Sequence, residues 1–409
     1  MNKGLRTVIN SAVLVGALGY FVDIYDIVLF SIVRVSSLKS IGVAPGEMVN
    51  IGVFLINMQM IGMLLGGLIW GVLGDKRGRI SVLFGSIFLY SIANIGNAFV
   101  TSVPAYGAFR FLAGMGLAGE LGAAITLVSE VMTKETRGYG TSIVAAVGIC
   151  GAVAAALIGD SFSWQTAYIV GGCLGLTLLM TRIRLIESGL FSELKGPALK
   201  KGDLRMLVNS WERFSRYLRC ILIGLPIWFV IGIIITFSPE IAKELGVTGP
   251  VAAGKAIMYC YIGLAFGDIA SGLLSQFLGS RKKIVAGFLA LTATFITGTL
   301  LCRGLSPEAF YALCALLGVS TGYWAMFVTI ASEQFGTNLR ATVTTTVPNF
   351  VRGSVVPLAL VFRALSPTTG LVNAALMIGA GCLIVASLAL IGMSETFGKD
   401  LNFIELSDS

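Results

Sequence analysis

The chain contains no histidine and few charged residues. Lysine, arginine, aspartate and glutamate together make up 12% of its 409 residues, about half of the roughly 25% found in soluble domains. Hydrophobic residues make up 56%, which is more apolar surface than a soluble fold of this size can hide, so lipid is the expected solvent. Without histidine, any proton chemistry must use an aspartate, a glutamate or a lysine with a shifted pKa.

Several signatures of soluble enzymes are also missing. The sequence has no P-loop, which argues against an ATP-driven pump, and no glycine-rich dinucleotide fingerprint after a strand. The seven cysteines stand singly, without a CxxC pair, which indicates buried thiols instead of a zinc site or disulfides. We therefore expect no enzyme, no bound metal, no cofactor and no nucleic-acid partner.

Long apolar runs dominate what is present. A membrane-spanning helix needs about 20 mostly apolar residues, and twelve runs meet this need. They lie near 8–33, 49–73, 80–99, 104–131, 138–160, 165–184, 218–239, 253–278, 284–302, 307–331, 342–363 and 370–393. We predict an all-α membrane protein of twelve helices in two six-helix bundles, 1–184 and 218–409.

The segment between the bundles, 185–217, is polar and basic. Its later part, 204–217, mixes apolar and basic residues as a helix lying in the membrane interface would. Lysine and arginine gather in alternate connections, and such residues favour the cytoplasmic side. We therefore expect a monomer in the bilayer of a bacterial inner membrane, with both termini in the cytoplasm.

Two short motifs recur in the halves. GVLGDKRGR at 71–79 is echoed by GLLSQFLGSR at 272–281, about 201 positions on, and SEVMTKETRG at 129–138 by SEQFGTNLRA at 332–341, 203 positions on. Parallel six-helix repeats of this kind occur in major facilitator transporters. GVLGDKRGR resembles the signature loop of that superfamily between helices 2 and 3, although Gln276 and Ser280 depart from it in the second copy. The resemblance implies two bundles around a central cavity with alternating access.

GYFVDIYDIVLF in the first run and RFLAGMGLAGELGAA in the fourth resemble metabolite–proton symporters, nearest to those of sialic acid and organic acids. The seventh-helix signature of sugar porters and the fifth-helix signature of drug antiporters are absent. The resemblance favours proton-coupled symport of a small organic anion or metabolite. A proton-coupled exporter of drugs, siderophores or metabolites remains the alternative.

Ionisable residues at bilayer depth are costly and therefore candidates for function. Counted at 1.5 Å per residue, Asp26 and Arg110 lie about 10 Å and 9 Å below the same boundary, which predicts a coupling pair or a static ion pair. Asp23 lies one turn from Asp26 and could share its proton. Glu120 is a further proton site or a polar lock. Sodium could replace the proton at the two aspartates.

Arg352 lies about 15 Å inside the eleventh run, near the midplane of a core about 30 Å thick. Arginine can hold a carboxylate through two parallel hydrogen bonds, so we expect Arg352 to anchor an anionic substrate. The alternative is an internal pair with Asp268. Asn349 lies one turn from Arg352. Other candidate substrate contacts are the aromatic and amide residues Tyr20, Tyr25, Asn57, Gln59, Trp228, Tyr323 and Trp324.

The repeated motifs supply the candidate gate. Asp75 is expected to face the positive end of a helix, and the resemblance assigns Glu130 and Arg137 to a cytoplasmic cluster of salt bridges. The expected gating residues are Gly71, Asp75, Arg77, Gly78, Arg79, Glu130, Arg137, Glu333 and Arg340.

Overall fold

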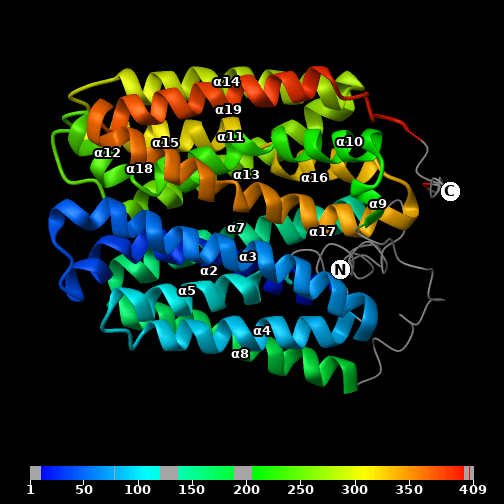
Figure 1. Cartoon of the computed structure of the whole chain (residues 1–409), viewed down its shortest axis with the longest axis horizontal. Helices are drawn as coiled ribbons and strands as arrows, with labels where there is room; N and C mark the ends of the chain where they lie inside the picture. The colour runs from blue at the N-terminus through cyan, green and yellow to red at the C-terminus, as the bar shows by residue number, and fades with distance from the viewer. Residues whose placement is uncertain (1–10, 78, 120–136, 188–204, 400–404, 406–409) are drawn as a thin grey trace, which may run out of the picture. The chain divides into compact units, whose positions relative to one another are not determined.

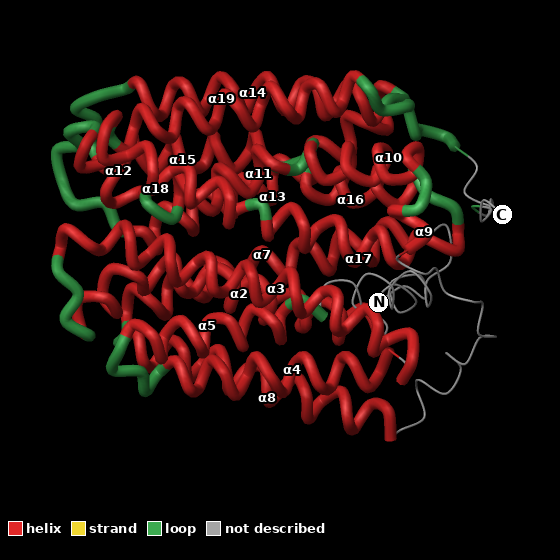
Figure 2. The backbone as a smooth tube through the Cα atoms, in the orientation of Figure 1, coloured by secondary structure: helices red, strands yellow, loops and turns green. Residues whose placement is uncertain are grey.

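The computed structural model describes residues 11–77, 79–119, 137–187, 205–399 and 405. All regular secondary structure in these residues is helical (Figure 2). The chain divides into two compact units, 1–200 and 201–409, here called unit 1 and unit 2. The division lies inside the 185–217 connection.

The described residues of unit 1 form six long helices that run alongside one another (Figure 1). They are α2 (Ser11–Ser40), α3 (Met48–Arg77), α4 (Arg79–Asn97), α5 (Val103–Leu117), α7 (Arg137–Ser161) and α8 (Trp164–Glu187). Each begins within three residues of a predicted run. Two helices end well away from the predicted position: α5 ends at Leu117, 14 residues before the predicted 131, and α2 continues seven residues past the predicted end at 33. The last turns of α2 are polar, yet Arg34 is buried there, so the change in hydropathy does not mark the end of that helix.

Unit 2 begins with two short helices, α9 (Arg205–Val208) and α10 (Trp211–Leu222). We expected 204–217 to lie apart from the seventh span. Instead α10 buries Arg213, Tyr217 and Cys220 and leads directly into that span. The amphipathic pattern therefore reflects a helix with one face packed inside unit 2.

The seventh, tenth and eleventh predicted spans of unit 2 are broken into pieces. The seventh continues through α11 (Leu225–Phe229), the π-helix η3 (Val230–Ile235) and α12 (Ser238–Glu244). The tenth consists of α15 (Pro307–Thr321) and α16 (Trp324–Glu333), and the eleventh of α17 (Thr337–Gly353) and α18 (Val355–Thr369). The others are single helices, α13 (Ala253–Leu278), α14 (Arg281–Leu301) and α19 (Leu371–Ile391).

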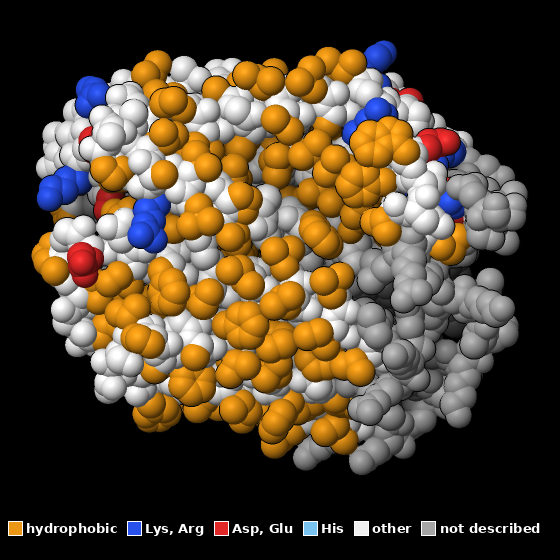
Figure 3. Space-filling model, viewed as in Figure 1, with side chains coloured by type: hydrophobic (Ala, Val, Ile, Leu, Met, Phe, Trp, Pro, Cys, Tyr) orange, Lys and Arg blue, Asp and Glu red, His pale blue; other side chains and the backbone are white. Residues whose placement is uncertain are grey.

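Nine segments of the described residues are long and apolar enough to cross a membrane. Every one of the twelve predicted runs overlaps at least one described helix. On the face drawn in Figure 3, hydrophobic side chains cover the helices while charged ones gather toward the ends. The molecule is a multi-pass, all-α membrane protein, and twelve spans are consistent with it.

Close helix contacts at glycines recur at equivalent positions of the two units. A Cβ atom at Gly62 or Gly66 of α3 would collide with the backbone of α5, and one at Gly263 or Gly267 of α13 with the backbone of α15. The two glycine pairs are 201 positions apart (263 minus 62), as are the first repeated motifs. Small residues allow membrane helices to approach this closely, so the internal repeat extends to the packing.

In three helices of unit 2, a backbone N–H of the first turn donates a hydrogen bond to a carboxylate from another part of the chain. Glu244 accepts the first backbone N–H of α19 at 2.8 Å, and Glu395 accepts the first N–H of α14 at 2.9 Å. Asp268 accepts the second N–H of α16 at 3.1 Å. The first N–H groups of a helix lack partners within it and carry partial positive charge, so these acids fix where the three helices start.

Glu395 lies after the end of α19, outside the apolar spans. Partial burial acts to raise the pKa of Glu395, but hydrogen bonds from Ser280 Oγ and from nearby backbone N–H groups outweigh it and lower the pKa to about 2 from its ordinary 4.5. A carboxyl with a lowered pKa stabilises the fold above its unfolded pKa, and this contribution is lost as the pH falls through the folded value.

We therefore expect Glu395→Gln to lower the melting temperature by roughly 1–2 °C at pH 7. The deficit should persist down to about pH 5, shrink below pH 4.5 and vanish toward pH 2. Melting curves of the purified protein across this range measure it, with the exposed Glu47→Gln as control. A deficit that is independent of pH would contradict the assignment.

Candidate functional site

Two tryptophans flank one arginine in unit 2. The guanidinium carbon of Arg352 on α17 lies 5.7 Å from the ring centroid of Trp228 on α11 and 5.7 Å from that of Trp324 on α16. The two indoles meet edge to face, 6.3 Å apart. All three side chains are buried, Arg352 to 99%. Three residues predicted separately as substrate contacts thus form one cluster, here called the aromatic box.

The surroundings of the box hold its members in place. Phe327 packs on Trp324 with ring centroids 5.2 Å apart. Trp228 lies two residues before the π-helix η3, and such helices often occur at functional sites. Asn349, one turn before Arg352, donates from Nδ2 to the carbonyl of Thr345 at 3.1 Å. The box is therefore built from broken or irregular helices.

Asp268 is not the partner of Arg352. It makes no ion pair in the described part of the chain, and its Oδ1 accepts from the backbone of Ala325. Tyr323 is not part of the box either. Its hydroxyl donates to the carbonyl of Ile223 at 3.0 Å, and its ring faces Phe288. This packing does not favour Tyr323 as a substrate contact, because its polar atom is already satisfied inside unit 2.

Arg110 is fully buried in unit 1. Its Nη2 donates to Gln59 Oε1 on α3, and its guanidinium carbon lies 4.6 Å from the ring centroid of Phe30 on α2. Nε and Nη1 find no acceptor among the described residues. The predicted pair of Arg110 with Asp26 is not an ion pair in this structure, where Gln59 and Phe30 hold the guanidinium.

The carboxylate of Asp26 is also buried, and Asp23 and Arg110 are the charged groups that interact with it. Asn94 on α4 lies beside it, and a Cβ at Gly171 on α8 would touch Oδ1. Neither Asp26 oxygen has a hydrogen bond of normal geometry within the described residues. Burying an unpaired carboxylate is costly, and protonation removes the charge that causes the cost.

The remaining polar candidates of unit 1 lie in different places. The hydroxyl of Tyr25 donates to the carbonyl of Ala167 on α8 at 2.9 Å, in a fully buried position. This bond ties α2 to α8 and does not favour Tyr25 as a substrate contact. Tyr20 packs against Val13, Ala17 and Val144, between α2 and α7. Asn57 on α3 is buried.

A pair of tyrosines in unit 1 was not predicted from the sequence. The hydroxyls of Tyr106 on α5 and Tyr168 on α8 lie 2.7 Å apart, and Tyr106 also donates to Ser37 Oγ at 3.2 Å. Single aromatic residues in apolar runs usually only pack. Here they carry a polar connection across three helices.

Among the predicted gating residues, only the side chains of those in unit 2 are described. Glu333 pairs with Arg281 at 3.2 Å, whereas Arg340 donates to the carbonyls of Ser332 and Phe335. Arg281 was missed as a partner because it lies in the other repeated motif. Three predicted gating or proton residues lie outside the described residues: Gly78, Glu120 and Glu130. For five further positions the structure describes only the helical backbone: Gly71, Asp75, Arg77, Arg79 and Arg137.

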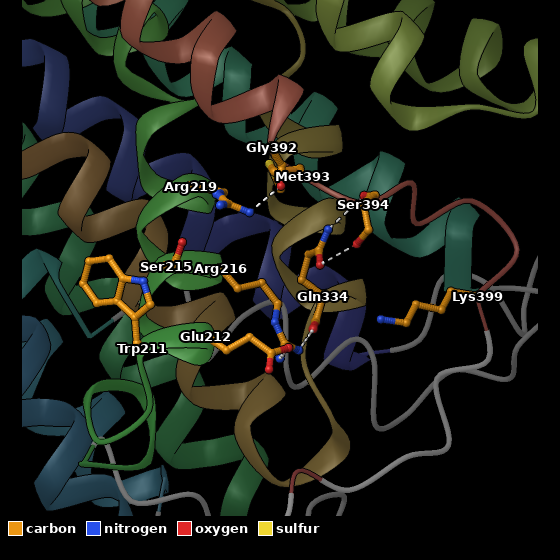
Figure 4. A pocket seen from close by; sticks show the side chains of 10 residues that line it. All are labelled: Trp211, Glu212, Ser215, Arg216, Arg219, Gln334, Gly392, Met393, Ser394 and Lys399. Carbon is orange, nitrogen blue, oxygen red and sulfur yellow. Dashed lines mark hydrogen bonds and ion pairs between the residues drawn. The ribbon is translucent and has the colours of Figure 1, made fainter.

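A separate cavity of about 500 Å³ lies at one end of unit 2, between α10 and the segment after α19 (Figure 4). The two arginines that line it are already engaged. Arg216 contacts Glu405 at 2.8 Å and Glu212 at 3.3 Å, and Arg219 donates to the carbonyl of Gly392. The arrangement fastens the C-terminal segment to α10, so we do not regard it as the substrate site.

Comparisons with known proteins agree with this architecture. The family model described as Major Facilitator Superfamily matches residues 16–354. A niacin transporter of Acinetobacter baylyi is 25% identical, covering 95% of this chain and 94% of that protein. A 3-(3-hydroxy-phenyl)propionate transporter of Escherichia coli K12 is 27% identical, covering 88% and 90%.

Among solved structures, a D-xylose-proton symporter superposes with a TM-score of 0.69 at 16% identity, covering 95% of this chain and 99% of that one. At this identity the likeness concerns the fold alone.

Proposed function

The chain belongs to the Major Facilitator Superfamily, and from this premise we propose that it takes up a small aromatic carboxylate together with a proton. Transport in place of catalysis follows from the family and from relatives named as transporters. The substrate and the coupling ion are our inference. The observation that carries it is the aromatic box, in which Arg352 lies between Trp228 and Trp324.

The box offers two kinds of contact at once. A guanidinium can bind a carboxylate through two parallel, charge-assisted hydrogen bonds. Indole faces and edges pack well against another aromatic ring. The substrates named for the two relatives, niacin and 3-(3-hydroxy-phenyl)propionate, each combine an aromatic ring with a carboxylate, which supports this substrate class.

The proton is assigned to Asp26, with Asp23 as its neighbour. Asp26 is buried in unit 1, neither of its oxygens has a hydrogen bond of normal geometry among the described residues, and Gln59 holds Arg110. A movement of helix α2 or α5 that changes the distance from Arg110 to Asp26 changes the cost of ionising the acid. Such a movement is how substrate binding and proton binding would be linked.

A ligand screen by thermal shift tests the proposal. Nicotinate, benzoate and 3-(3-hydroxyphenyl)propionate should raise the melting temperature, since a ligand at 100 times its dissociation constant adds about 2.7 kcal/mol of stability. Matched probes each lack one feature: nicotinamide lacks the charge and cyclohexanecarboxylate lacks the aromatic ring. Equal shifts with the matched probes would overturn the aromatic-carboxylate assignment, and shifts with bulky apolar cations alone would point to efflux instead.

A further inference from the structure

Asp268 lies outside the aromatic box but is connected to it through one peptide. It is a partly exposed residue of α13, and its Oδ1 accepts the backbone N–H of Ala325 at 3.1 Å. Ala325 directly follows Trp324, the first residue of α16. The carboxylate therefore holds the turn of backbone that carries one wall of the box.

The local backbone explains why an aspartate, with its short side chain, can reach the start of α16. The tenth span breaks after Thr321, and α16 starts anew at Trp324. A Cβ at Gly322 would collide with the backbone of Gly267, so α13 touches the break itself. Asp268 follows Gly267 in the chain and is thus placed within reach of the new helix start.

The first turn of a new helix is held weakly by its own hydrogen bonds. Its first N–H groups have no acceptor within the helix, and a side-chain oxygen that accepts one of them stabilises the turn. Tyr323, the residue at the cap position of α16, makes no side-chain cap of its own. Asp268 supplies that acceptor from another helix.

We propose that Asp268 is a positioning residue for the substrate site, which fixes Trp324 beside Arg352 by capping α16. This inference rests on the proposed function, because it assigns the aromatic box to the substrate. Without the cap, the first turn of α16 frays and the indole of Trp324 loses its fixed distance to the guanidinium. Substrate affinity falls, while the steps that reorient the transporter change little.

The test compares Asp268→Ala and Asp268→Asn with Glu244→Ala, a matched control that removes an acid cap from α19 in the same unit. The probe is 3-(3-hydroxyphenyl)propionate, or whichever aromatic carboxylate shifts the melting temperature of the wild type most. Asp268→Ala should weaken binding about tenfold, the size expected for a lost cap, and raise the KM of transport by the same factor with less than a twofold change in maximal rate. Asp268→Asn should bind nearly as wild type, since the amide oxygen still accepts the N–H.

The proposal is overturned if Asp268→Ala binds like wild type, if Asp268→Asn is as weak as Asp268→Ala, or if Glu244→Ala loses as much affinity. Should Asp268→Ala fail to fold, Asp268→Ser takes its place, because its shorter side chain stops short of the N–H.

Hydrogen exchange separates this inference from the proposed function, since it needs no substrate. In Asp268→Ala the amides of 322–327 should exchange at least tenfold faster while those of 371–373 do not, and Glu244→Ala should show the reverse. Unchanged exchange at 322–327 would overturn the cap. A wild type that binds no aromatic carboxylate but shows this exchange pattern would instead overturn the proposed function.

Discussion

Replacement of Asp26 by asparagine is expected to abolish accumulation of substrate against its gradient while exchange of substrate across the membrane continues. The asparagine side chain has nearly the same shape as a protonated aspartate but cannot release a proton. A transporter locked in the protonated form can still reorient with substrate bound, yet an imposed pH gradient no longer drives it.

Proteoliposomes measure both activities. With an interior at pH 7.5 and an exterior at pH 5.5, wild type should concentrate a labelled aromatic carboxylate well beyond protein-free vesicles, which report passive entry of the neutral acid, whereas Asp26→Asn should show no accumulation beyond those vesicles. Preloaded vesicles should show counterflow with both proteins. The control is Asp160→Asn, an exposed acid near the end of α7 in the same unit. Full pH-driven accumulation by Asp26→Asn would refute the assignment of the proton to this residue.

Replacement of Arg352 by alanine is expected to weaken substrate binding on the order of a hundredfold to a thousandfold. Truncating one partner of a buried, hydrogen-bonded charge pair costs about 2–5 kcal/mol, and the carboxylate of the substrate would be left without its cation. Arg352→Lys should lie between wild type and alanine, because lysine keeps the charge but loses the planar fork and its stacking on indole.

Calorimetry of nicotinate binding to wild type, Arg352→Lys and Arg352→Ala measures these affinities. Arg363→Gln on α18 is the matched control, since Arg363 is an exposed arginine of unit 2. Nicotinamide, which lacks the carboxylate, should lose little affinity in Arg352→Ala. Equal losses for nicotinate and nicotinamide would mean that the arginine supports the fold of the site and does not bind the charge.

The spans and their internal repeat could be predicted because each depends on local composition. An apolar run long enough to cross a bilayer has few alternatives to a helix, and the 201-residue offset of the motifs is matched by the offset of Gly62 and Gly263 at helix contacts. The end of α2 could not be read this way. Arg34 and Ser37 resemble the start of a loop in sequence, yet both are buried within the helix.

The members of the aromatic box could be predicted one at a time, because charged and large aromatic residues stand out in apolar runs. Their contact with one another in the fold could not be predicted. Trp324 reaches Arg352 only because the tenth span breaks at Gly322 and restarts, and a single unbroken helix was the expectation. Tyr25 was predicted as a substrate contact, but its hydroxyl donates to a carbonyl 142 residues away. No local sequence pattern specifies such a partner.

Simultaneous flux of substrate and proton tests the central claim most directly. Proteoliposomes loaded with a pH-sensitive dye receive an aromatic carboxylate at equal internal and external pH, and the lumen pH is followed. Wild type should acidify the lumen in step with substrate entry, well beyond protein-free vesicles, which report leakage of the neutral acid, and beyond Asp26→Asn. Substrate entry through the protein with no acidification above these blanks, or with alkalinisation, would contradict proton symport.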